Sequence, residues 1–291
     1  MTRRGWLLFS AMCVLWGIPY LLIKIAVEEL SPAVLVFGRT ALAAAILLPI
    51  AASRGQLRPL LAYWRPVLAF AALEMAIPWL LLANAERSLS SSLTGLLVAA
   101  VPLVAALAGR AIGAADRLDR GRLLGLVIGV IGVAVLLGLD LGGELRAALE
   151  VAVVVVGYAT GPLIISRKLS DVPALGVIAA SLGLTAVVYA PFAAAHWPAQ
   201  APSARVVSSV IVLALACTVV AFLVFFALIA EAGPNRALVV TFVNPAVAVL
   251  LGVALLGEHL TAGLLVGFPL ILVGCLLATR AARPVPELLA S

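Results

Sequence analysis

The chain has 291 residues, of which 65% are hydrophobic and 11% are charged, and its formal net charge is +6. Soluble domains are nearer half apolar and a quarter charged, so this composition excludes a soluble globular protein. At about 20 residues per spanning helix, ten helices would leave only short loops, which excludes an added soluble catalytic domain.

Ten apolar stretches follow one another along the chain, each long enough to cross a bilayer. They are predicted as helices over residues 6–27, 33–52, 66–85, 92–112, 123–139, 147–166, 174–195, 206–230, 236–256 and 262–279. The predicted fold class is therefore an all-α integral membrane protein with ten transmembrane helices.

The basic residues fall mostly on one side of this arrangement. With the N-terminus inside, the cytoplasmic side holds Arg3, Arg4, Arg54, Arg58, Arg65, Arg117, Arg120, Arg122, Arg167, Lys168, Arg236, Arg280 and Arg283, and the outside holds Arg87, Arg146 and Arg205. Cytoplasmic loops are enriched in Lys and Arg, so this bias predicts a multi-pass protein of the bacterial inner membrane with both termini cytoplasmic. The positive charge orients the chain in the membrane and predicts no nucleic-acid partner.

The second half of the sequence resembles the first at a fixed offset of 142 residues. The matched pairs are Trp16 and Tyr158, Leu42 and Leu184, Pro49 and Pro191, Leu118 and Leu260, Gly125 and Gly267, and Gly132 and Gly274. The predicted boundaries are a first five-helix repeat at 1–142, a second at 143–284 and a disordered cytoplasmic tail at 285–291. Because five crossings are an odd number, the second repeat is inverted, which is typical of secondary transporters.

Glu74 is the clearest ionisable residue at predicted membrane depth, near the middle of the third helix. A charged side chain at a helix centre costs about 2.5–3.5 kcal/mol to insert and usually serves a function. Three interpretations are open: Glu74 binds a cationic or amino group of the substrate, carries a coupling proton, or forms a structural ion pair.

Two basic residues lie in the outer thirds of the first two helices. Lys24 either takes part in gating or extends to the outer interface as a capped helix end. The deeper Arg39 either binds a substrate carboxylate or phosphate bidentately or closes an outer gate by pairing with Glu28 or Glu29. The repeat partners of Lys24 and Arg39 are both serines, so the two halves differ here, as an asymmetric binding site would require.

Aromatic, polar and proline residues complete the predicted pocket. The aromatic candidates for lining its centre are Trp16, Tyr20, Trp79 and Tyr158, and the uncharged hydrogen-bonding candidates are Asn84, Thr160 and Asn244. The alternative interpretation of both groups is helix packing. Prolines at mid-depth free backbone carbonyls and let a helix bend, so gating is assigned to Pro19, Pro78, Pro102 and Pro245.

Glycines align on the fifth and tenth predicted helices, at Gly125, Gly129 and Gly132 and at Gly267 and Gly274. Small residues let helices approach closely in lipid, either within the bundle or between two copies. The protein is therefore expected to be a monomer or a weak homodimer, with membrane lipid and a small-molecule substrate as its other partners.

These motifs together resemble the drug/metabolite transporter superfamily, in its ten-helix EamA-type branch. The resemblance covers essentially the whole chain and rests on Trp16-Gly17-Ile18-Pro19 through Lys24, Phe37-Gly38-Arg39, Val101-Pro102, Ala115-Asp116-Arg117-Leu118, Gly233-Pro234-Asn235-Arg236, Asn244-Pro245 and Leu256-Gly257-Glu258-His259-Leu260. It implies a basket-shaped bundle of two inverted five-helix repeats whose usual activity is export of small metabolites.

The predicted function is a secondary transporter that exports a small organic metabolite by alternating access. A site with both Glu74 and Arg39 would suit a zwitterion, so an amino acid or related amine is the hypothesised cargo. Efflux of hydrophobic cations is the alternative within this class, and a membrane enzyme acting on a lipid-linked substrate or a non-transporting scaffold are alternatives outside it. No catalytic constellation, phosphate-binding loop or metal-ligand spacing is present, so neither a cofactor nor a metal is expected.

Overall fold

The computed structural model describes residues 1–111, 120–140, 144–237 and 239–279, and its elements are all helical. In chain order they are α1 (Arg3–Ala26), α2 (Pro32–Ser53), η1 (Arg58–Tyr63), α3 (Trp64–Phe70), η2 (Ala71–Ala76), α4 (Ile77–Ala85), α5 (Ser91–Val98), α6 (Val101–Ala111), α7 (Arg120–Asp140), α8 (Leu145–Lys168), α9 (Ala174–Ala195), α10 (Ala204–Ala214), η3 (Leu215–Val220), α11 (Ala221–Ala232), α12 (Pro234–Ala237), α13 (Val240–Leu256) and α14 (Ala262–Ala278). Eight continuous helical stretches are long and apolar enough to cross a membrane, and α13 and α14 are shorter apolar helices. The ten predicted spans are therefore confirmed.

Three spans are built from more than one element. The third runs from Arg58 to Ala85 and the eighth from Ala204 to Ala232, and each contains a π-helical segment, η2 and η3 respectively. The fourth is interrupted at Ala99–Ala100, where α5 ends before α6 begins. These irregularities were not predicted, because apolar periodicity does not distinguish α from π geometry.

Hydroxyl side chains begin five of the ten spans. N-terminal caps that accept a backbone N–H are formed by Thr2, Ser31, Ser90, Ser203 and Thr261. Such caps satisfy donors that the first helical turn leaves without a partner. The polar turns between apolar stretches therefore decide where each span starts.

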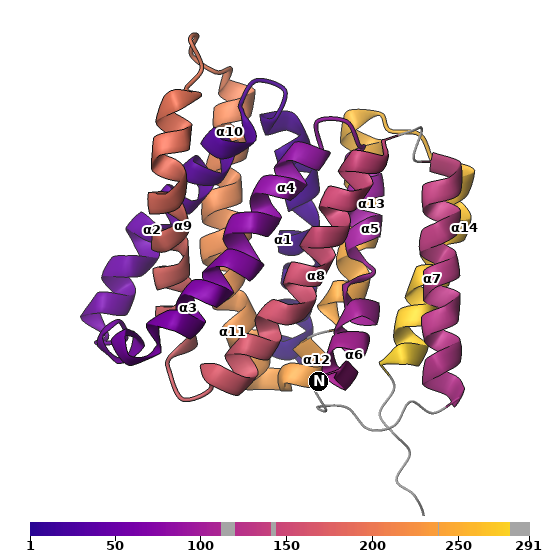
Figure 1. Cartoon of the computed structure of the whole chain (residues 1–291), viewed down its shortest axis with the longest axis horizontal. Coiled ribbons are helices and arrows are strands. Elements are labelled where there is room, and N and C mark those ends of the chain that lie inside the picture. Colours follow the sequence, from indigo (N-terminus) through magenta and orange to yellow (C-terminus); the bar gives the residue numbers. More distant parts are fainter. Residues whose placement is uncertain (112–119, 141–143, 238, 280–291) are drawn as a thin grey trace, which may run out of the picture.

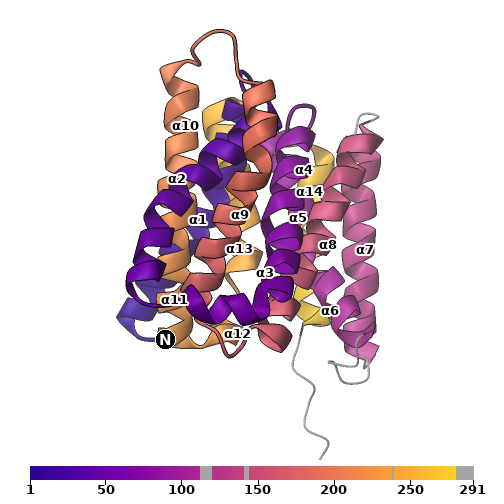
Figure 2. The same ribbon diagram turned by 60° about the vertical axis from the view of Figure 1, so that its left-hand side comes forward.

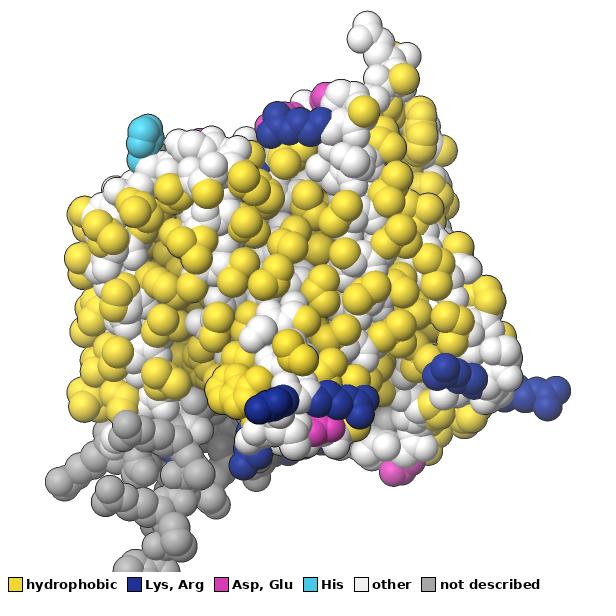
Figure 3. Space-filling view, turned by 180° about the vertical axis from the view of Figure 1, so that it is seen from behind, with side chains coloured by type: hydrophobic (Ala, Val, Ile, Leu, Met, Phe, Trp, Pro, Cys, Tyr) yellow, Lys and Arg dark blue, Asp and Glu magenta, His cyan; other side chains and the backbone are white. Residues whose placement is uncertain are grey.

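The bundle carries a belt of hydrophobic side chains between two polar ends (Figure 3). Many large apolar side chains are exposed, and examples are Val187, Leu250 and Leu124, whose exposed fractions are 72%, 68% and 56%. A soluble protein would bury such residues, whereas lipid tails solvate them. The structure is thus that of a multi-pass membrane protein.

Both ends of the described chain lie at one end of the bundle, which we call the terminal end; the opposite end is the far end. In Figures 1 and 2, α1 rises from the terminal end, whereas its repeat counterpart α8 descends toward it. The helix contacts show the same relation between the repeats. Corresponding helices pack on each other, namely α2 on α9, α7 on α14 and α5 on α13. The first helix of each repeat also packs on the fourth span of the other, α1 on α13 and α8 on α6. The two five-helix repeats are therefore inverted.

The aligned glycines of α7 and α14 face one another within the same chain. A Cβ on Gly125 would lie 2.5 Å from the backbone nitrogen of Ala278, and a Cβ on Gly132 would lie 2.7 Å from that of Ile271. These helices approach too closely for any side chain at the contact. In this structure the glycines therefore serve packing between two helices of one chain.

Several sequence predictions fall outside the described residues. They concern the repeat boundary at residue 142, the turn that contains Asp116 and Arg117, and the tail at 285–291.

The contact between α7 and α14 predicts opposite effects of two substitutions in one helix. Gly132→Ala should destabilise the protein by about 1–3 kcal/mol, because its new Cβ meets backbone atoms that cannot rotate away. Gly138→Ala should leave stability unchanged or slightly raised, because a Cβ there meets nothing within 4 Å and alanine favours helix. Thermal unfolding in detergent compares the two variants; equal melting temperatures would contradict the packing account.

Candidate functional site

Arg39 of α2 lies at the centre of a group of polar and aromatic residues. Only 7% of its surface is exposed. Its Nε donates a hydrogen bond to Thr218 Oγ1 in η3 at 2.9 Å, and its Cζ lies 3.7 Å from the ring centroid of Trp79 in α4. A guanidinium stacked on an indole is attracted by the ring's negative face. The guanidinium is therefore held at its Nε edge by Thr218 and on its face by Trp79.

No carboxylate forms an ion pair with Arg39 in the part of the chain that the structure describes. The interpretation that Arg39 pairs with Glu28 or Glu29 is accordingly wrong for this structure. Glu29 instead accepts a hydrogen bond from the backbone N–H of Ser203 at 2.7 Å. Arg39 is held instead by Thr218 and Trp79.

Glu74 enters this centre from the π segment η2. Pro78 follows the segment and has no backbone N–H to continue the ladder, while Ile77 donates to Ala72 five residues back. The Glu74 Oε2 atom is buried without a hydrogen-bond donor. It packs directly against Gly161 of α8, where a Cβ would overlap it. The predicted mid-membrane acid is therefore enclosed and has no structural ion-pair partner among the described residues.

Two tyrosines lie near Arg39, and one of them, Tyr158, also lies near Glu74. The Tyr158 hydroxyl lies within electrostatic reach of both Glu74 and Arg39 and close to the Trp79 indole. Tyr20 interacts with Tyr158 and Arg39 in the same way, and its ring packs 3.5 Å from where a Cβ of Gly95 would lie. We call Arg39, Glu74, Trp79, Tyr158, Tyr20 and Thr218 the central group.

Trp16 lies beside the central group. Its ring packs against Phe225 at 4.7 Å and against Phe222 at 6.2 Å. Phe222 in turn packs on the core cluster that includes Trp79 and Tyr158. Tyr20, Trp79 and Tyr158 thus lie around Arg39, and Trp16 is linked to them through Phe222.

Asn84 lies outside the central group. Its Nδ2 donates to both carboxylate oxygens of Glu150 in α8 at 2.8 Å, and Glu150 also pairs with Arg146 at 3.2 Å. The amide therefore joins two helices, as the packing interpretation expects, and its donors are not directed at a ligand.

The other two polar candidates differ from each other. The Thr160 hydroxyl donates to its own helix, at Val156 O and Gly157 O, so it is already satisfied. Asn244 Oδ1 in α13 is buried without a donor, beside the close contact that Gly17 makes with the backbone of α13. Of these two side chains, Asn244 is the one with a buried polar atom that has no hydrogen-bond partner.

The prolines predicted to take part in gating occupy two kinds of position in the spans. Pro78 ends a π segment and Pro102 follows the interruption in the fourth span, whereas Pro19 and Pro245 lie inside α1 and α13. Pro19 and Pro245, inside their helices, each remove one helical hydrogen bond.

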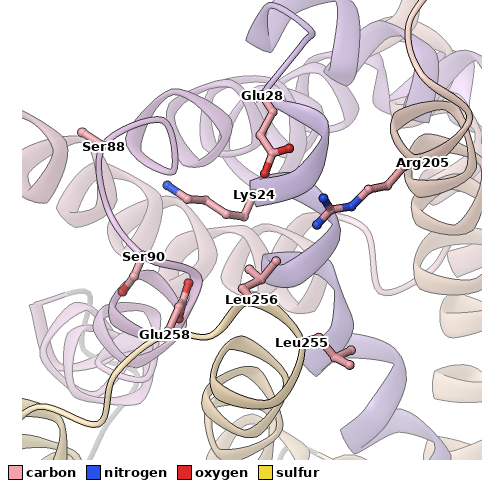
Figure 4. Close-up of a pocket in the computed structure, with 8 residues that line it drawn as sticks. All are labelled: Lys24, Glu28, Ser88, Ser90, Arg205, Leu255, Leu256 and Glu258. Atoms are coloured by element: carbon pink, nitrogen blue, oxygen red, sulfur yellow. The ribbon is translucent and has the colours of Figure 1, made fainter.

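A pocket of about 510 Å³ opens at the far end, between the two repeats (Figure 4). Its lining residues are Lys24, Glu28, Ser88, Ser90, Arg205, Leu255, Leu256 and Glu258. The side chains of Lys24, Glu28 and Arg205 reach into the same opening, and Glu258 lies beside Ser90. The pocket therefore presents charges of both signs.

Two carboxylates cross between the repeats beside this pocket. Glu258 accepts hydrogen bonds from the backbone N–H and hydroxyl groups of Ser91 and Ser92, at the N-terminus of α5. Glu29 of the first repeat reaches Ser203, the N-cap of α10 in the second. Hydrogen bonding from the Ser203 hydroxyl and backbone N–H lowers the pKa of the Glu29 carboxyl. Each acid thus binds a positive helix start in the other repeat.

The reach of Glu258 depends on two glycines. Gly257 has a φ of +68°, a left-handed conformation that ends α13 and turns the chain back. At Gly252 a Cβ would lie 2.5 Å from Ser92 Oγ and 2.8 Å from Ser91 Oγ, so no side chain fits there. The turn at Gly257, within the Leu-Gly-Glu motif noted in the sequence, therefore places the Glu258 carboxylate at the start of α5.

Lys24 does not extend to the interface. Its Nζ donates to the backbone carbonyls of Glu86 at 2.6 Å and Leu89 at 2.8 Å. It thereby holds the loop between α4 and α5, whereas the sequence alternative was a capped helix end extending to the outer interface.

Sequence reasoning missed three residues of this region. Thr218 is a lone hydroxyl in an apolar run, Glu86 was placed in an external loop, and Glu258 was noted only as part of a motif. Glu86 is fully buried and neither of its carboxylate oxygens has a hydrogen-bond partner. Only the repeat offset offered a signal for Thr218. Adding the offset of 142 residues to Glu74 gives position 216, two residues before Thr218.

Comparisons with known proteins agree with this architecture. The family model described as the EamA-like transporter family matches residues 3–138 and again residues 145–280. The uncharacterized inner membrane transporter YedA of Escherichia coli (strain K12) is 30% identical over 260 residues, which is 86% of this chain and 82% of YedA. The uncharacterized transporter YvbV of Bacillus subtilis (strain 168) is 25% identical over 289 residues, 96% of this chain and 92% of YvbV.

A crystal structure described only as that of a protein shares the fold, with a TM-score of 0.68 at 21% sequence identity, covering 98% of this chain and 100% of the other. The family match extends over nearly the whole chain and begins a second time 142 residues after the first. The chain therefore belongs to the EamA-like transporter family, within the drug/metabolite transporter superfamily, and is a multi-pass membrane transporter.

Proposed function

We propose that this transporter exports an amino acid or a related amine across the bacterial inner membrane by alternating access. The observation that carries the proposal is the central group, where Arg39 and Glu74 lie near one tyrosine without pairing with each other. A buried charge without a partner is costly, so a ligand that supplies the missing partners binds favourably. A zwitterion supplies both, its carboxylate to Arg39 and its ammonium to Glu74.

The electrostatics favour a zwitterion over a hydrophobic cation. Two like charges about 4 Å apart repel by about 4 kcal/mol near a protein surface, and a cation without a carboxylate has no group to offset this repulsion from Arg39. The same repulsion favours the amino acid over the related amine. The aromatic walls formed by Trp16, Tyr20 and Tyr158 would pack on the apolar part of either ligand. The charge of Arg39 therefore decides between the two cargo classes.

Coupling to protons follows from Glu74. Its enclosed carboxylate needs a positive partner when it is ionised, and either a proton or the ammonium group of the cargo can supply it. Exchange of one for the other would link outward movement of cargo to inward movement of a proton. Most described Lys and Arg residues of the loops lie at the terminal end, which supports a cytoplasmic location for both termini.

Alternating access requires the far end to open and close. The contacts of Glu258 with α5 and of Glu29 with α10 hold the repeats together there. We assign these two carboxylates, with Lys24, to the outer gate, and the prolines of the interrupted spans to the bending that the rocking needs.

A flux measurement tests the cargo and the role of Glu74. Purified protein is placed in liposomes loaded with an equimolar mixture of the twenty amino acids and their decarboxylated amines, and mass spectrometry follows the external medium. We expect pH-dependent efflux of one or a few compounds, abolished by Glu74→Gln and preserved in Glu144→Gln, which alters an exposed carboxylate at the start of α8. Full efflux in Glu74→Gln would remove Glu74 from the mechanism, and no efflux from wild type would overturn the proposed cargo.

Gly161→Ala is a second test of the role of Glu74, because it changes the position of the carboxylate and not its charge. Its Cβ would occupy the place of the Glu74 carboxylate, so transport should fall at least tenfold although no ionisable group has changed. Gly138→Ala adds the same methyl group in open space and should transport as wild type does. Normal flux in Gly161→Ala would mean that the carboxylate position is unimportant.

The gate assignment predicts a change in access at the far end. Glu258→Gln weakens the contact with α5, so a cysteine placed at Leu256 in the pocket should react several-fold faster with a membrane-impermeant maleimide. Glu144→Gln in the same cysteine background is the control, because that carboxylate makes no contact with α5. Equal labelling rates in all three proteins would argue against a gate at Glu258.

A further inference from the structure

Thr218 occupies a special position in the second repeat. It is the fourth residue of the π segment η3, as Glu74 is the fourth residue of the π segment η2. The two segments lie in corresponding spans of the two repeats and differ by two residues from the offset of 142. π segments in long helices occur frequently at functional sites. Each repeat therefore directs one polar side chain to the central group from the same kind of distortion.

The hydrogen bonds of Thr218 differ from those of the other threonines within spans. Thr40, Thr160 and Thr185 donate to the carbonyl four residues earlier. Thr218 donates to Leu213 O, five residues earlier, at 2.8 Å, because the π segment displaces its side chain. A hydroxyl has one hydrogen to donate. With that hydrogen directed to Leu213, the fully buried oxygen of Thr218 faces Arg39 only as an acceptor.

This acceptor determines how the guanidinium is turned. Trp79 supports the face of the Arg39 guanidinium, but a stacked ring does not fix rotation within the plane of contact. The hydrogen bond from Nε to Thr218 fixes that rotation. The edge formed by the two Nη atoms is thereby left for a bidentate ligand, which is the geometry that carboxylates accept from arginine.

We propose that Thr218 is a positioning residue that directs Arg39 toward the carboxylate of the cargo. The inference rests on the proposed function, because it assumes a cargo with a carboxylate at Arg39. Thr218 itself does not touch the cargo. Its hydroxyl, held by the π segment of the second repeat, sets the orientation of a cation that belongs to the first.

The experiment compares three substitutions at one position. Thr218→Val removes the hydroxyl and keeps the shape, Thr218→Ser keeps the hydroxyl, and Thr218→Cys replaces it with a weak acceptor should the valine variant fail to fold. Each protein is placed in liposomes, and KM and maximal rate are measured for the amino acid that the wild type moves and for the matched amine that lacks its carboxylate. Melting temperatures in detergent confirm that each variant is folded.

We expect KM for the amino acid to rise about tenfold in Thr218→Val, as the loss of a hydrogen bond to a charged group predicts, and to stay near the wild-type value in Thr218→Ser. KM for the matched amine should not change in either. Equal changes for amino acid and amine would show a structural role and overturn the inference, as would an unchanged KM in a folded Thr218→Val or Thr218→Cys.

The same assay separates this inference from the proposed function. If wild type moves an amino acid and Thr218→Val leaves its KM unaltered, only the positioning role fails. If wild type moves amines but no compound with a carboxylate, the assignment of Arg39 as carboxylate anchor fails, and the role of Thr218 fails with it. If wild type moves neither class, both proposals are overturned.

Discussion

The burial of Arg39 is the constraint on which the central part of this structure depends. A guanidinium cannot lose its proton in a protein, so a cation between spanning helices must be stabilised by what surrounds it. The structure supplies an indole face, one hydroxyl acceptor and two nearby tyrosines, and among the described residues no carboxylate forms an ion pair with Arg39. Each of these partners is neutral, so the positive charge is solvated by the protein without being cancelled.

The distortions in the spans follow from the same need. Straight α-helices satisfy their own backbone and direct side chains outward at fixed intervals. The π segments η2 and η3 break that interval in the third span of each repeat, and they carry Glu74 and Thr218 into one region. The two repeats thus share this backbone distortion but differ in the side chain it carries, which is an acid in the first repeat and a hydroxyl in the second. An inverted pair with identical chemistry could not distinguish the two ends of a zwitterion.

Much of the fold could be predicted from the sequence, because membrane helices are long, apolar and separated by polar turns. The ten spans and the inverted repeat followed from hydropathy and a constant offset, and the family from the resemblance of its motifs. The sequence also indicated that Arg39 and Glu74 share one region with Trp79, Tyr158 and Tyr20, since a lone charge in an apolar run must face a cavity or a partner. The partners of these residues were not predictable in the same way. Which acceptor Arg39 finds, and where Lys24 and Glu29 direct their side chains, depends on contacts between helices distant in the sequence.

The hydrogen bond between Arg39 and Thr218 joins one repeat to the other, and this has a thermodynamic consequence. If a ligand binds more tightly when that bond is formed, its binding must strengthen the bond by the same free energy, because linkage between two equilibria is reciprocal. Movement of the second repeat relative to the first would then alter ligand affinity without any change in the residues that touch the ligand. A bound carboxylate would stabilise the closed arrangement, and separation of the repeats would favour its dissociation. A single neutral hydroxyl can in this way couple the occupancy of the centre to the position of the two halves.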